Sequence, residues 1–488
     1  MTITDPRPQP ERHADADRRV RGVVSKLVGT RQDWRLYRPV APQRRPRMSW
    51  IGPIVVAVSV LVGWFAFAGA AGKEGDPTLG FFVGAASIQL MAWSFVLAIR
   101  IKWLEPFFGG LDSMYRVHRW CGSIAVVAMF LHTQLEPEIR GGVRGASRDL
   151  KDSAEDLAGL AEISLYVLVG ISLVRIIPYR FWRLTHKLLG IPFIFASAHF
   201  FTATKPYANG SAWGLWFGAF MVAGTAAYIW RVIVNDMIRR GAKYKVVRTR
   251  RVGINTELQL TPATGRRIDH RIGQFAILRI HHRGLSEPHP FTIASHPDDE
   301  ELRFIIRDLG DWTDKIGAAD LAGVTVEIEG PFGRFEPFRH DDQTHIWIAG
   351  GVGVTPFLSA LPTRSQIMPV APYVFFAVKS VEDAPGLDLL REAHRAGHIK
   401  LHVFDSSAGQ RLSIEAISAA VPPGQINGAH VALCGPAGLV RTLQRGTIGL
   451  GAQSVEVEDF DFRQGFGPEL SREVEELVTT ATKRFGTP

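Results

Sequence analysis

Four histidines stand in two apolar segments of the chain. His118 and His132 share one segment at a spacing of fourteen positions, and His186 and His199 share the other at a spacing of thirteen. Imidazole is the commonest metal ligand and titrates near neutral pH. Histidines placed inside apolar segments are usually functional. Two chemistries fit this pattern: facing histidines can supply both axial ligands of a haem iron, or they can form the proton relay of a transporter.

The segments that hold the histidines belong to a predicted set of six membrane spans. About 20 mostly apolar residues cross the hydrocarbon core. Residues 49–72, 77–99 and 206–230 contain no charged side chain, and residues 117–134, 157–177 and 181–204 contain only a few. An even number of spans puts both termini on one side. The first half of the chain is therefore predicted to be a six-helix transmembrane bundle in a multi-pass membrane protein.

The distribution of charge predicts the orientation and excludes one class of partner. Residues 1–48 carry 12 Lys and Arg against 5 Asp and Glu, so the difference of +7 supplies most of the chain's net charge of +9. Such a basic tail before the first span predicts cytoplasmic termini by the positive-inside rule. The rest of the chain is nearly neutral, which argues against a nucleic-acid surface. The two cysteines are too few for a four-cysteine cluster.

The histidine spacings predict two pairs at two depths. Fourteen and thirteen helical residues span about 21 Å and about 19.5 Å, and spans three and five run in the same direction. His118 therefore matches His186 at the inner level, and His132 matches His199 at the outer level. Fourteen residues are close to four full turns, so His118 and His132 share a helix face. Thirteen residues leave about 140° of rotation, and we expect a kink at Pro192 to absorb part of it. Two stacked haems are predicted, and histidines satisfied within the bundle or a proton relay are the alternatives.

The second half of the chain has the pattern of two soluble domains. Short apolar runs at residues 245–249, 257–260, 275–280, 302–306 and 324–328, separated by turns, predict an antiparallel β-barrel. From residue 345 onward, strands at 346–348, 373–378, 400–404, 430–433 and 454–457 alternate with helical stretches such as 385–396 and 413–421. This alternation predicts a doubly wound parallel sheet.

A glycine-rich turn follows the first strand of that parallel sheet. It consists of Gly350, Gly351, Val352, Gly353, Val354, Thr355 and Pro356. Glycines let the backbone approach a pyrophosphate, and the following helix start contributes a positive dipole. Cys434, Gly435 and Pro436 end a later strand at the same edge, where open α/β sheets bind their ligands.

Five ordered motifs then resemble a known family. His289-Pro290-Phe291-Thr292 and Ile306-Arg307-Asp308-Leu309-Gly310-Asp311-Trp312-Thr313 are similar to the FAD site of the NADPH oxidase and ferric reductase superfamily. Gly330-Pro331-Phe332-Gly333, the glycine-rich turn and Cys434-Gly435-Pro436 follow in that family's order. The histidine spacings also match its haem domain, and the resemblance covers about residues 50–466.

The resemblance implies roles for individual residues. Thr292 would face the flavin N5 region beside Pro290, Phe291 and Gly330, while His289 and Arg307 would hold the FAD phosphates over a backbone cradle of Gly310, Asp311, Trp312 and Thr313. Residues 350–356 would hold the nicotinamide pyrophosphate, and Cys434, with Gly435 and Pro436, would border the nicotinamide. Phe460, Phe462 and Phe466 are candidates to cover the flavin. Lys379, Ser380 and Arg411 are candidates for a 2′-phosphate, which would favour NADPH over NADH.

The expected organisation is a cytoplasmic tail (1–48), a di-haem membrane domain (49–240), an FAD domain (241–342), an NAD(P)H domain (343–467) and an amphipathic tail (468–488). The expected function is electron transfer from cytoplasmic NADPH or NADH through FAD and two b-type haems to oxygen or chelated ferric iron on the far side.

Oxidases of this family are expected to carry an arginine in the first outer loop and a second histidine past the outer ligand. This chain has Lys73 and Glu136 there, which argues against oxygen.

Two other functions remain open. A haem-free membrane-anchored flavin reductase would pass electrons to a quinone or a partner protein. A proton-coupled transporter would use the histidines and would leave the flavin module unexplained.

Overall fold

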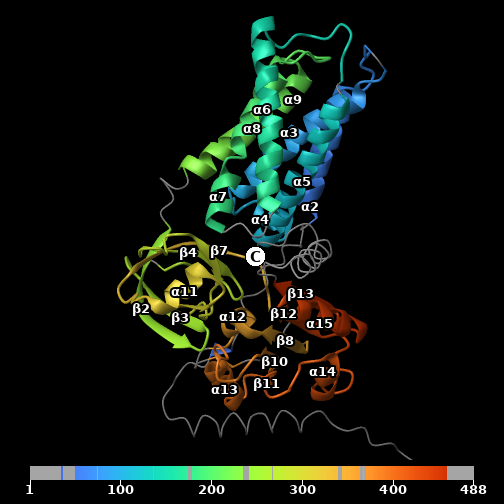
Figure 1. Cartoon of the computed structure of the whole chain (residues 1–488). Helices are drawn as coiled ribbons and strands as arrows, with labels where there is room; N and C mark the ends of the chain where they lie inside the picture. Colours follow the sequence, from blue (N-terminus) through green and yellow to red (C-terminus); the bar gives the residue numbers. More distant parts are fainter. Residues whose placement is uncertain are drawn as a thin grey trace, which may run out of the picture.

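A bundle of helices sits on two β-sheet domains in the computed structural model (Figure 1). The structure describes residues 35–36, 50–73, 75–135, 137–173, 179–234, 241–265, 267–338, 343–362, 366–367 and 370–458. Phe460, Phe462, Phe466 and the tail at 468–488 lie outside the described residues, and so does most of the tail at 1–48.

Each predicted span contains helix. The elements of the bundle are α2 (Ile51–Leu61) with η1 (Val62–Ala66), α3 (Thr78–Ala98), the short α4 (Glu105–Phe108), α5 (Leu111–Leu135), α6 (Arg148–Leu173), α7 (Tyr179–Lys187), α8 (Gly190–Thr202) and α9 (Ala212–Ile229) with η2 (Trp230–Val234). Among the described residues, two helices are long and apolar enough to cross a membrane, Thr78–Ala98 and Ala212–Val234, and Ile51–Ala66 is a shorter apolar helix. The count of six spans therefore stays a prediction.

The outer faces of the histidine-bearing helices are apolar. On α5, the exposed large residues Trp120, Ile124, Val127 and Leu131 recur every three or four positions, so they form one stripe along the helix. Soluble monomers rarely leave such a large apolar patch exposed. The stripe is the surface that a lipid-facing helix needs.

Two local expectations about the bundle differ from the structure. The helix that contains His186 and His199 is not one rod kinked at Pro192, because it ends at Lys187 and restarts at Gly190. Turns of backbone hydrogen bonding join the two pieces, with the Leu189 amide donating to the His186 carbonyl. This interruption at residues 188–189 lies between the two histidines, just before Pro192. In addition, α6 begins at Arg148, inside the predicted loop, and Asp149 lies in its first turn, where an acidic side chain stabilises a helix.

The first soluble domain is a six-stranded antiparallel sheet in the order β5-β4-β7-β2-β3-β6. Its strands are β2 (Ala242–Val252), β3 (Asn255–Pro262), β4 (Phe275–Ile280), β5 (His289–Thr292), β6 (Leu302–Arg307) and β7 (Thr325–Phe332), with helix α11 (Asp311–Ala318) after β6. One bridge, between Ile293 and Phe304, links the β5 and β6 edges. The antiparallel arrangement is confirmed, and full closure into a barrel stays a prediction.

The second soluble domain is the predicted parallel sheet, with strand order β11-β10-β8-β12-β13. The strands are β8 (His345–Gly350), β10 (Tyr373–Val378), β11 (Lys400–Asp405), β12 (His430–Cys434) and β13 (Ser454–Glu458), and α12 (Thr355–Leu358), α13 (Leu387–Arg395), α14 (Ile414–Ala420) and α15 (Ala437–Gly449) connect them. Strand order reverses between β8 and β12, which is the place where such sheets bind ligands. A two-residue pair, β1 (Arg35–Leu36) with β9 (Gln366–Ile367), adds a small parallel ladder.

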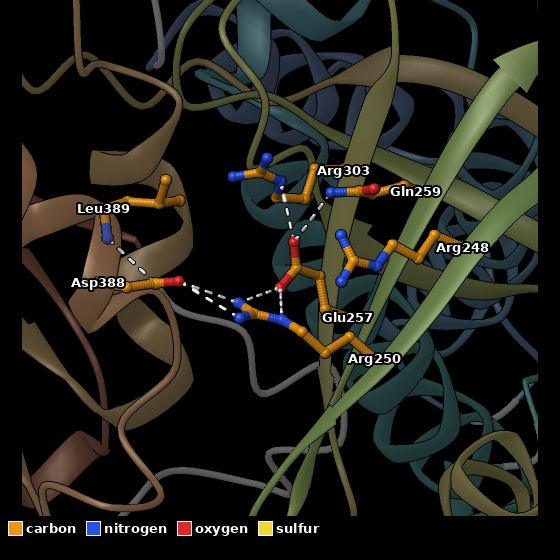
Figure 2. A pocket seen from close by; sticks show the side chains of 7 residues that line it. All are labelled: Arg248, Arg250, Glu257, Gln259, Arg303, Asp388 and Leu389. Carbon is orange, nitrogen blue, oxygen red and sulfur yellow. Dashed lines mark hydrogen bonds and ion pairs between the residues drawn. The ribbon is translucent and has the colours of Figure 1, made fainter.

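An arginine bridge links the two soluble domains. Figure 2 shows Arg250 of β2 reaching both Glu257 of β3 and Asp388 at the start of α13. Its Nη2 lies 2.8 Å from Glu257 Oε2 and 3.2 Å from Asp388 Oδ2. Arg303 approaches the other oxygen of Glu257 at 3.0 Å. This network orients the parallel-sheet domain against the antiparallel one.

Candidate functional site

The two histidines predicted for the inner level face each other. His118 projects from α5 and His186 from α7, and their ring centroids are 6.0 Å apart with an interplanar angle of 68°. Trp182, one turn before His186, stacks on the His186 ring at 4.9 Å. The structure therefore brings together two side chains that are far apart in the sequence.

The outward nitrogen of each ring is held by the protein. His118 Nδ1 lies 2.8 Å from the Ser94 carbonyl oxygen of α3. His186 Nδ1 lies 3.2 Å from Ser172 Oγ of α6. The Ser172 hydroxyl donates to the Leu168 carbonyl, so it accepts from the ring. Because Nδ1 carries the proton in both cases, Nε2 is left as a lone-pair donor for a metal.

The spacing of these rings fits one iron between them. Two metal–imidazole bonds of about 2 Å each, plus about 1 Å from each nitrogen to its ring centre, put the centroids roughly 6 Å apart. The observed separation is 6.0 Å. A carbonyl or hydroxyl on Nδ1 is also the usual support for a ligating histidine. The inner pair thus has the spacing and tautomer that axial haem ligation requires.

His132 repeats the His118 arrangement one level further along the bundle. Its Nδ1 lies 2.9 Å from the carbonyl oxygen of Gly80, and the interval from Gly80 to Ser94 on the antiparallel helix α3 equals that from His118 to His132. The equal spacing confirms that the two histidines share the face of α5 that packs on α3. A Cβ on Gly84 would lie 2.6 Å from His132 Nδ1, so the glycine leaves room for the ring. His199 lies on α8, and its pairing with His132 stays a prediction.

The antiparallel domain docks at the His118 end of the bundle. Phe275, Ile277 and Phe332 of the sheet belong to the same buried cluster as Phe108 and Met114 of the helices. The connection between α3 and α5 is held against the sheet by three hydrogen bonds. Its contacts are Lys102 Nζ to the Gly330 carbonyl at 2.9 Å, the Gly333 amide to Glu105 Oε1 at 2.9 Å, and Arg334 to the Pro106 carbonyl at 3.3 Å.

Glu105 is the residue at this junction that sequence reasoning missed. Burial raises the pKa of Glu105 above its usual value of 4.5, against the hydrogen bond from the Gly333 amide. An acidic residue in a short connection gave no signal, because its partner lies 228 positions later in the chain.

The proposed flavin motifs converge on one side of the sheet. His289 and Phe291 of β5 both pack against Trp312 of α11, with ring centroids 4.1 Å and 5.7 Å away. Thr292 ends β5, is buried, and pairs with Phe275 of β4. The structure thus assembles residues from two predicted motifs beside the face that meets the membrane bundle.

Buried donors mark a place for an anionic ligand. Arg307 Nε and Trp312 Nε1 are buried without a hydrogen-bond partner among the described residues. Buried polar groups are normally paired, so a ligand with acceptor atoms would satisfy both. One amide of the expected cradle is already engaged, because the Thr313 hydroxyl accepts from the Gly310 amide at 3.1 Å, as it does from the preceding Leu309 amide at 2.8 Å. The phosphates of FAD would offer acceptor atoms to Arg307 Nε and Trp312 Nε1.

The glycine-rich turn and the cysteine motif meet backbone to backbone. Cys434 pairs with Ala349 at the ends of β12 and β8. A Cβ on Gly353 would lie 2.4 Å from the Cys434 carbonyl oxygen, and one on Gly350 would lie 2.6 Å from Pro436. Both glycines are thus required by close packing of two loops at the switch point. The helix that follows, α12, ends at Leu358.

Arg307 lies between the two predicted ligand sites. A Cβ on Gly351 would be 3.9 Å from Arg307 Nη1, so the last residue of β6 reaches the glycine-rich turn of the neighbouring domain. A flavin held by Arg307 and a nicotinamide held by the turn would therefore be adjacent.

The candidate 2′-phosphate site contains an acidic residue that sequence reasoning missed. Lys379 and Arg411 are both exposed, and Ser380 donates its hydroxyl to Glu382. Asp405 ends β11 and accepts hydrogen bonds from the Val381 amide at 3.0 Å and the Ser407 hydroxyl at 2.6 Å. The Ser407 hydroxyl lowers the pKa of Asp405. An ionised carboxylate at a strand end is the usual partner of a ribose 2′-hydroxyl.

Two family models match parts of the chain. The ferric reductase like transmembrane component matches residues 83–197, and an FAD-binding domain matches residues 258–336. The first match contains His118, His132 and His186 and ends just before His199. The second match contains the motif residues from His289 to Gly333.

Curated relatives agree with these matches. Dual oxidase 2 of Sus scrofa is 23% identical over 386 residues, which cover 68% of this chain and 24% of that protein. Ferric reduction oxidase 5 of Arabidopsis thaliana is 23% identical over 333 residues, or 64% of this chain and 44% of that protein. The chain thus spans about a quarter of the length of the first relative. Among solved structures, the FAD/NAD-binding domain of nitric oxide dioxygenase from Vibrio cholerae is 19% identical with a TM-score of 0.39, covering 45% of this chain and 99% of that one.

Proposed function

We propose that this chain, a member of the NADPH oxidase and ferric reductase superfamily, transfers electrons from cytoplasmic NAD(P)H through FAD and two b-type haems to an acceptor on the opposite face of the membrane. The observation that carries the proposal is the facing pair His118 and His186, 6.0 Å apart, at the end of the bundle where the FAD domain docks. FAD, when bound, converts a two-electron hydride donor into single electrons, which haem irons can carry one at a time.

The residues of the two soluble domains bind and align the donor. The turn at 350–356 and the Cys434 motif hold the nicotinamide nucleotide at the switch point. Arg307 and Trp312 offer buried donors to the FAD phosphates, and Thr292 lies at the end of the neighbouring strand β5. The contacts of the connection between α3 and α5 keep this assembly against the helices, so that the flavin side of the sheet faces the inner histidines.

The residues of the bundle fix the ligands and exclude water. Carbonyls of Ser94 and Gly80 orient His118 and His132, and Ser172 orients His186. His118 with His186, and His132 with His199, would each hold a haem, and haems held by two histidines would supply electron transfer rather than ligand binding. We place His132 and His199 at the outer level, six spans in the membrane, and both termini in the cytoplasm.

The acceptor is oxygen or chelated ferric iron. Among the described residues of the first outer loop, the cation is Lys73, whose Nζ pairs with Glu138 at 2.9 Å. The first outer loop carries Lys73 where the superoxide-producing oxidases are expected to carry an arginine, and Glu136 stands where they are expected to carry a second histidine. These two departures favour ferric-chelate reduction over superoxide production.

A haem-free flavin reductase is the rival function, and absorbance separates the two. The proposal predicts a b-type spectrum after dithionite reduction of the purified chain and two haems for each flavin. Replacing His132 with Leu should remove half of the haem while NAD(P)H still reduces the flavin. Replacing Gln134, an exposed neighbour on the same helix, with Leu is the matched control. A purified chain that contains flavin and no haem would leave the reductase as the function.

A further inference from the structure

A large pocket lies where the bundle meets the antiparallel domain, and Gly330 and Phe332 of the Gly330-Pro331-Phe332-Gly333 motif form part of its lining. Its volume is about 730 Å³, within the range of about 300–1,000 Å³ typical of ligand sites. We call it the junction pocket and define it by Arg100, Lys102, Trp103, Trp230, Ile268 and Phe332, which are among the residues that line it.

The position of the junction pocket corresponds to the inner surface of the membrane. Arg100 and Lys102 follow directly after α3, and Trp230 follows α9. These are the two helices that are long and apolar enough to cross a bilayer. The other wall comes from strand ends of the FAD domain. The pocket therefore opens at the level of lipid headgroups, between a membrane-spanning part and a soluble part.

Its lining combines the two surfaces that a phospholipid presents. Trp103 is 68% exposed and Trp230 is 39% exposed, and tryptophan is enriched at the membrane interface. Ile99, Ile101 and Phe332 add apolar surface. The basic side chains Arg100 and Lys102 face one carboxylate, Glu329, whose nearest oxygen is 3.5 Å from Arg100 Nη1. The lining therefore carries one positive charge in excess, which is suited to a phosphodiester.

Arg100 is held at the pocket by an unusual backbone conformation. Its φ is +64°, and it is the one non-glycine residue with positive φ among those described. Such conformations are energetically unfavourable and persist where surrounding structure enforces them. Here the conformation lets Arg100 Nε donate to the Tyr115 hydroxyl of α5 at 2.6 Å while Nη1 approaches Glu329. Arg100 thus connects the bundle side of the pocket to the FAD-domain side.

We propose that the junction pocket binds one anionic phospholipid of the inner leaflet, with its phosphate at Lys102 and Arg100 and its first acyl carbons between Trp103 and Trp230. The lipid fills the gap between the two domains and fixes the FAD domain beneath the inner histidines. A free phosphate would leave the indoles and isoleucines without a partner. The tail at 1–48, with its charge difference of +7, has the same sign as the pocket.

Lipid retention tests the proposal without any enzymatic readout. The full chain is placed in nanodiscs of phosphatidylcholine mixed with phosphatidylglycerol, and co-purifying lipid is measured by native mass spectrometry. Phosphatidylglycerol should be retained over phosphatidylcholine. Lys102→Gln should lower this preference about five-fold, the value of one basic residue near an anionic surface. Arg116→Gln removes an exposed charge on α5 that does not line the pocket and should leave the preference unchanged.

A photo-crosslink identifies the occupant directly. Trp103 is replaced by benzoylphenylalanine, and the adduct is weighed after irradiation. An adduct with the mass of phosphatidylglycerol supports the proposal. An adduct with residues 1–48 would overturn it, as would equal retention of the two lipids or equal losses in the two charge variants.

The consequence for electron transfer rests on the proposed function and is measured separately. In phosphatidylcholine alone, NADH should reduce the flavin at an unchanged rate, while transfer from flavin to haem is lost. If the chain holds no haem, the proposed function fails, yet the retention and crosslinking results still decide whether the pocket binds lipid.

Discussion

The hydroxyl of Ser172 should tune the inner haem, because it accepts the Nδ1 proton of His186. Replacing Ser172 with Ala removes this acceptor and leaves α6 intact, since alanine is a better helix former. The His186 ring then loses its support at 3.2 Å. His118 keeps its own, the Ser94 carbonyl at 2.8 Å. The perturbation is thus confined to one ligand of one level.

The expected size follows from the geometry. Partners of ligating histidines usually contribute about 10–100-fold to metal affinity, and a bond as long as 3.2 Å belongs at the lower end. A neutral hydrogen bond contributes about 1 kcal/mol, or about five-fold. Because the acceptor makes the imidazole more electron-donating, its loss should raise the inner reduction potential by about 40 mV, at about 59 mV per tenfold for one electron. The outer potential should not change.

A redox titration followed at the haem Soret band measures both potentials. Ser164→Ala is the matched control, because Ser164 lies on the same helix and its hydroxyl donates to the Ala161 carbonyl at 3.0 Å. The Ser172 variant should shift one of two titrating components, and the Ser164 variant should shift neither. Two unmoved components in Ser172→Ala would refute the assignment of His186 as a ligand supported through Nδ1.

Three further predictions concern the soluble domains and their junction. Arg307→Gln should weaken FAD retention by about tenfold or more, which is the loss expected for a charge-assisted hydrogen bond. Replacement of the exposed Arg283 with Gln is the control and should leave FAD retention unchanged. Equal FAD content of the two variants after dialysis would exclude Arg307 as an anchor. Asp405→Ser should raise kcat/KM for NADPH relative to NADH by about tenfold, because a carboxylate beside the 2′-phosphate is repulsive; an unchanged ratio in steady-state assays would remove Asp405 from the nucleotide site. Burial raises the pKa of Glu105 above 4.5, so its contribution to stability is complete below pH 4.5 and is lost as the pH rises through the raised pKa. Glu105→Gln keeps an acceptor for the Gly333 amide but does not titrate. The melting temperature of this variant should therefore rise relative to that of the native chain as the pH increases from 4.5 towards neutrality. A difference in melting temperature that does not change with pH would contradict this reasoning.

Local patterns in the sequence predicted most of the strands. The run at 373–378 coincides with β10, and the predicted strands at 346–348, 400–404 and 430–433 lie inside β8, β11 and β12. Their side chains are mostly apolar on both faces, as is typical of buried parallel strands. The strand β5 was missed because it consists of His289, Pro290, Phe291 and Thr292, a run without alternation that contains a proline.

The histidine pattern also came from the sequence, although its details did not. A spacing of fourteen positions on an α-helix fixes both the distance and the shared face of His118 and His132, whatever packs around them. The spacing of thirteen between His186 and His199 did not fix an angle, because the helix breaks between Lys187 and Gly190. Gly190 and Pro192 are local signals that disfavour a continuous helix there, but the angle between the two pieces depends on packing against the neighbouring helices.

Periodicity records which face of an element is buried, so the sequence by itself determined most of the helices and strands and the shared face of His118 and His132. The sequence does not indicate which distant residue each buried side chain contacts. Three contacts join residues that are far apart in the chain. They are the pairing of His118 with His186, the hydrogen bond between Glu105 and Gly333, and the approach of Arg307 to the glycine-rich turn. Only the packing of the bundle on the two sheets decided them, because each contact depends on the relative position of whole elements rather than on any one segment.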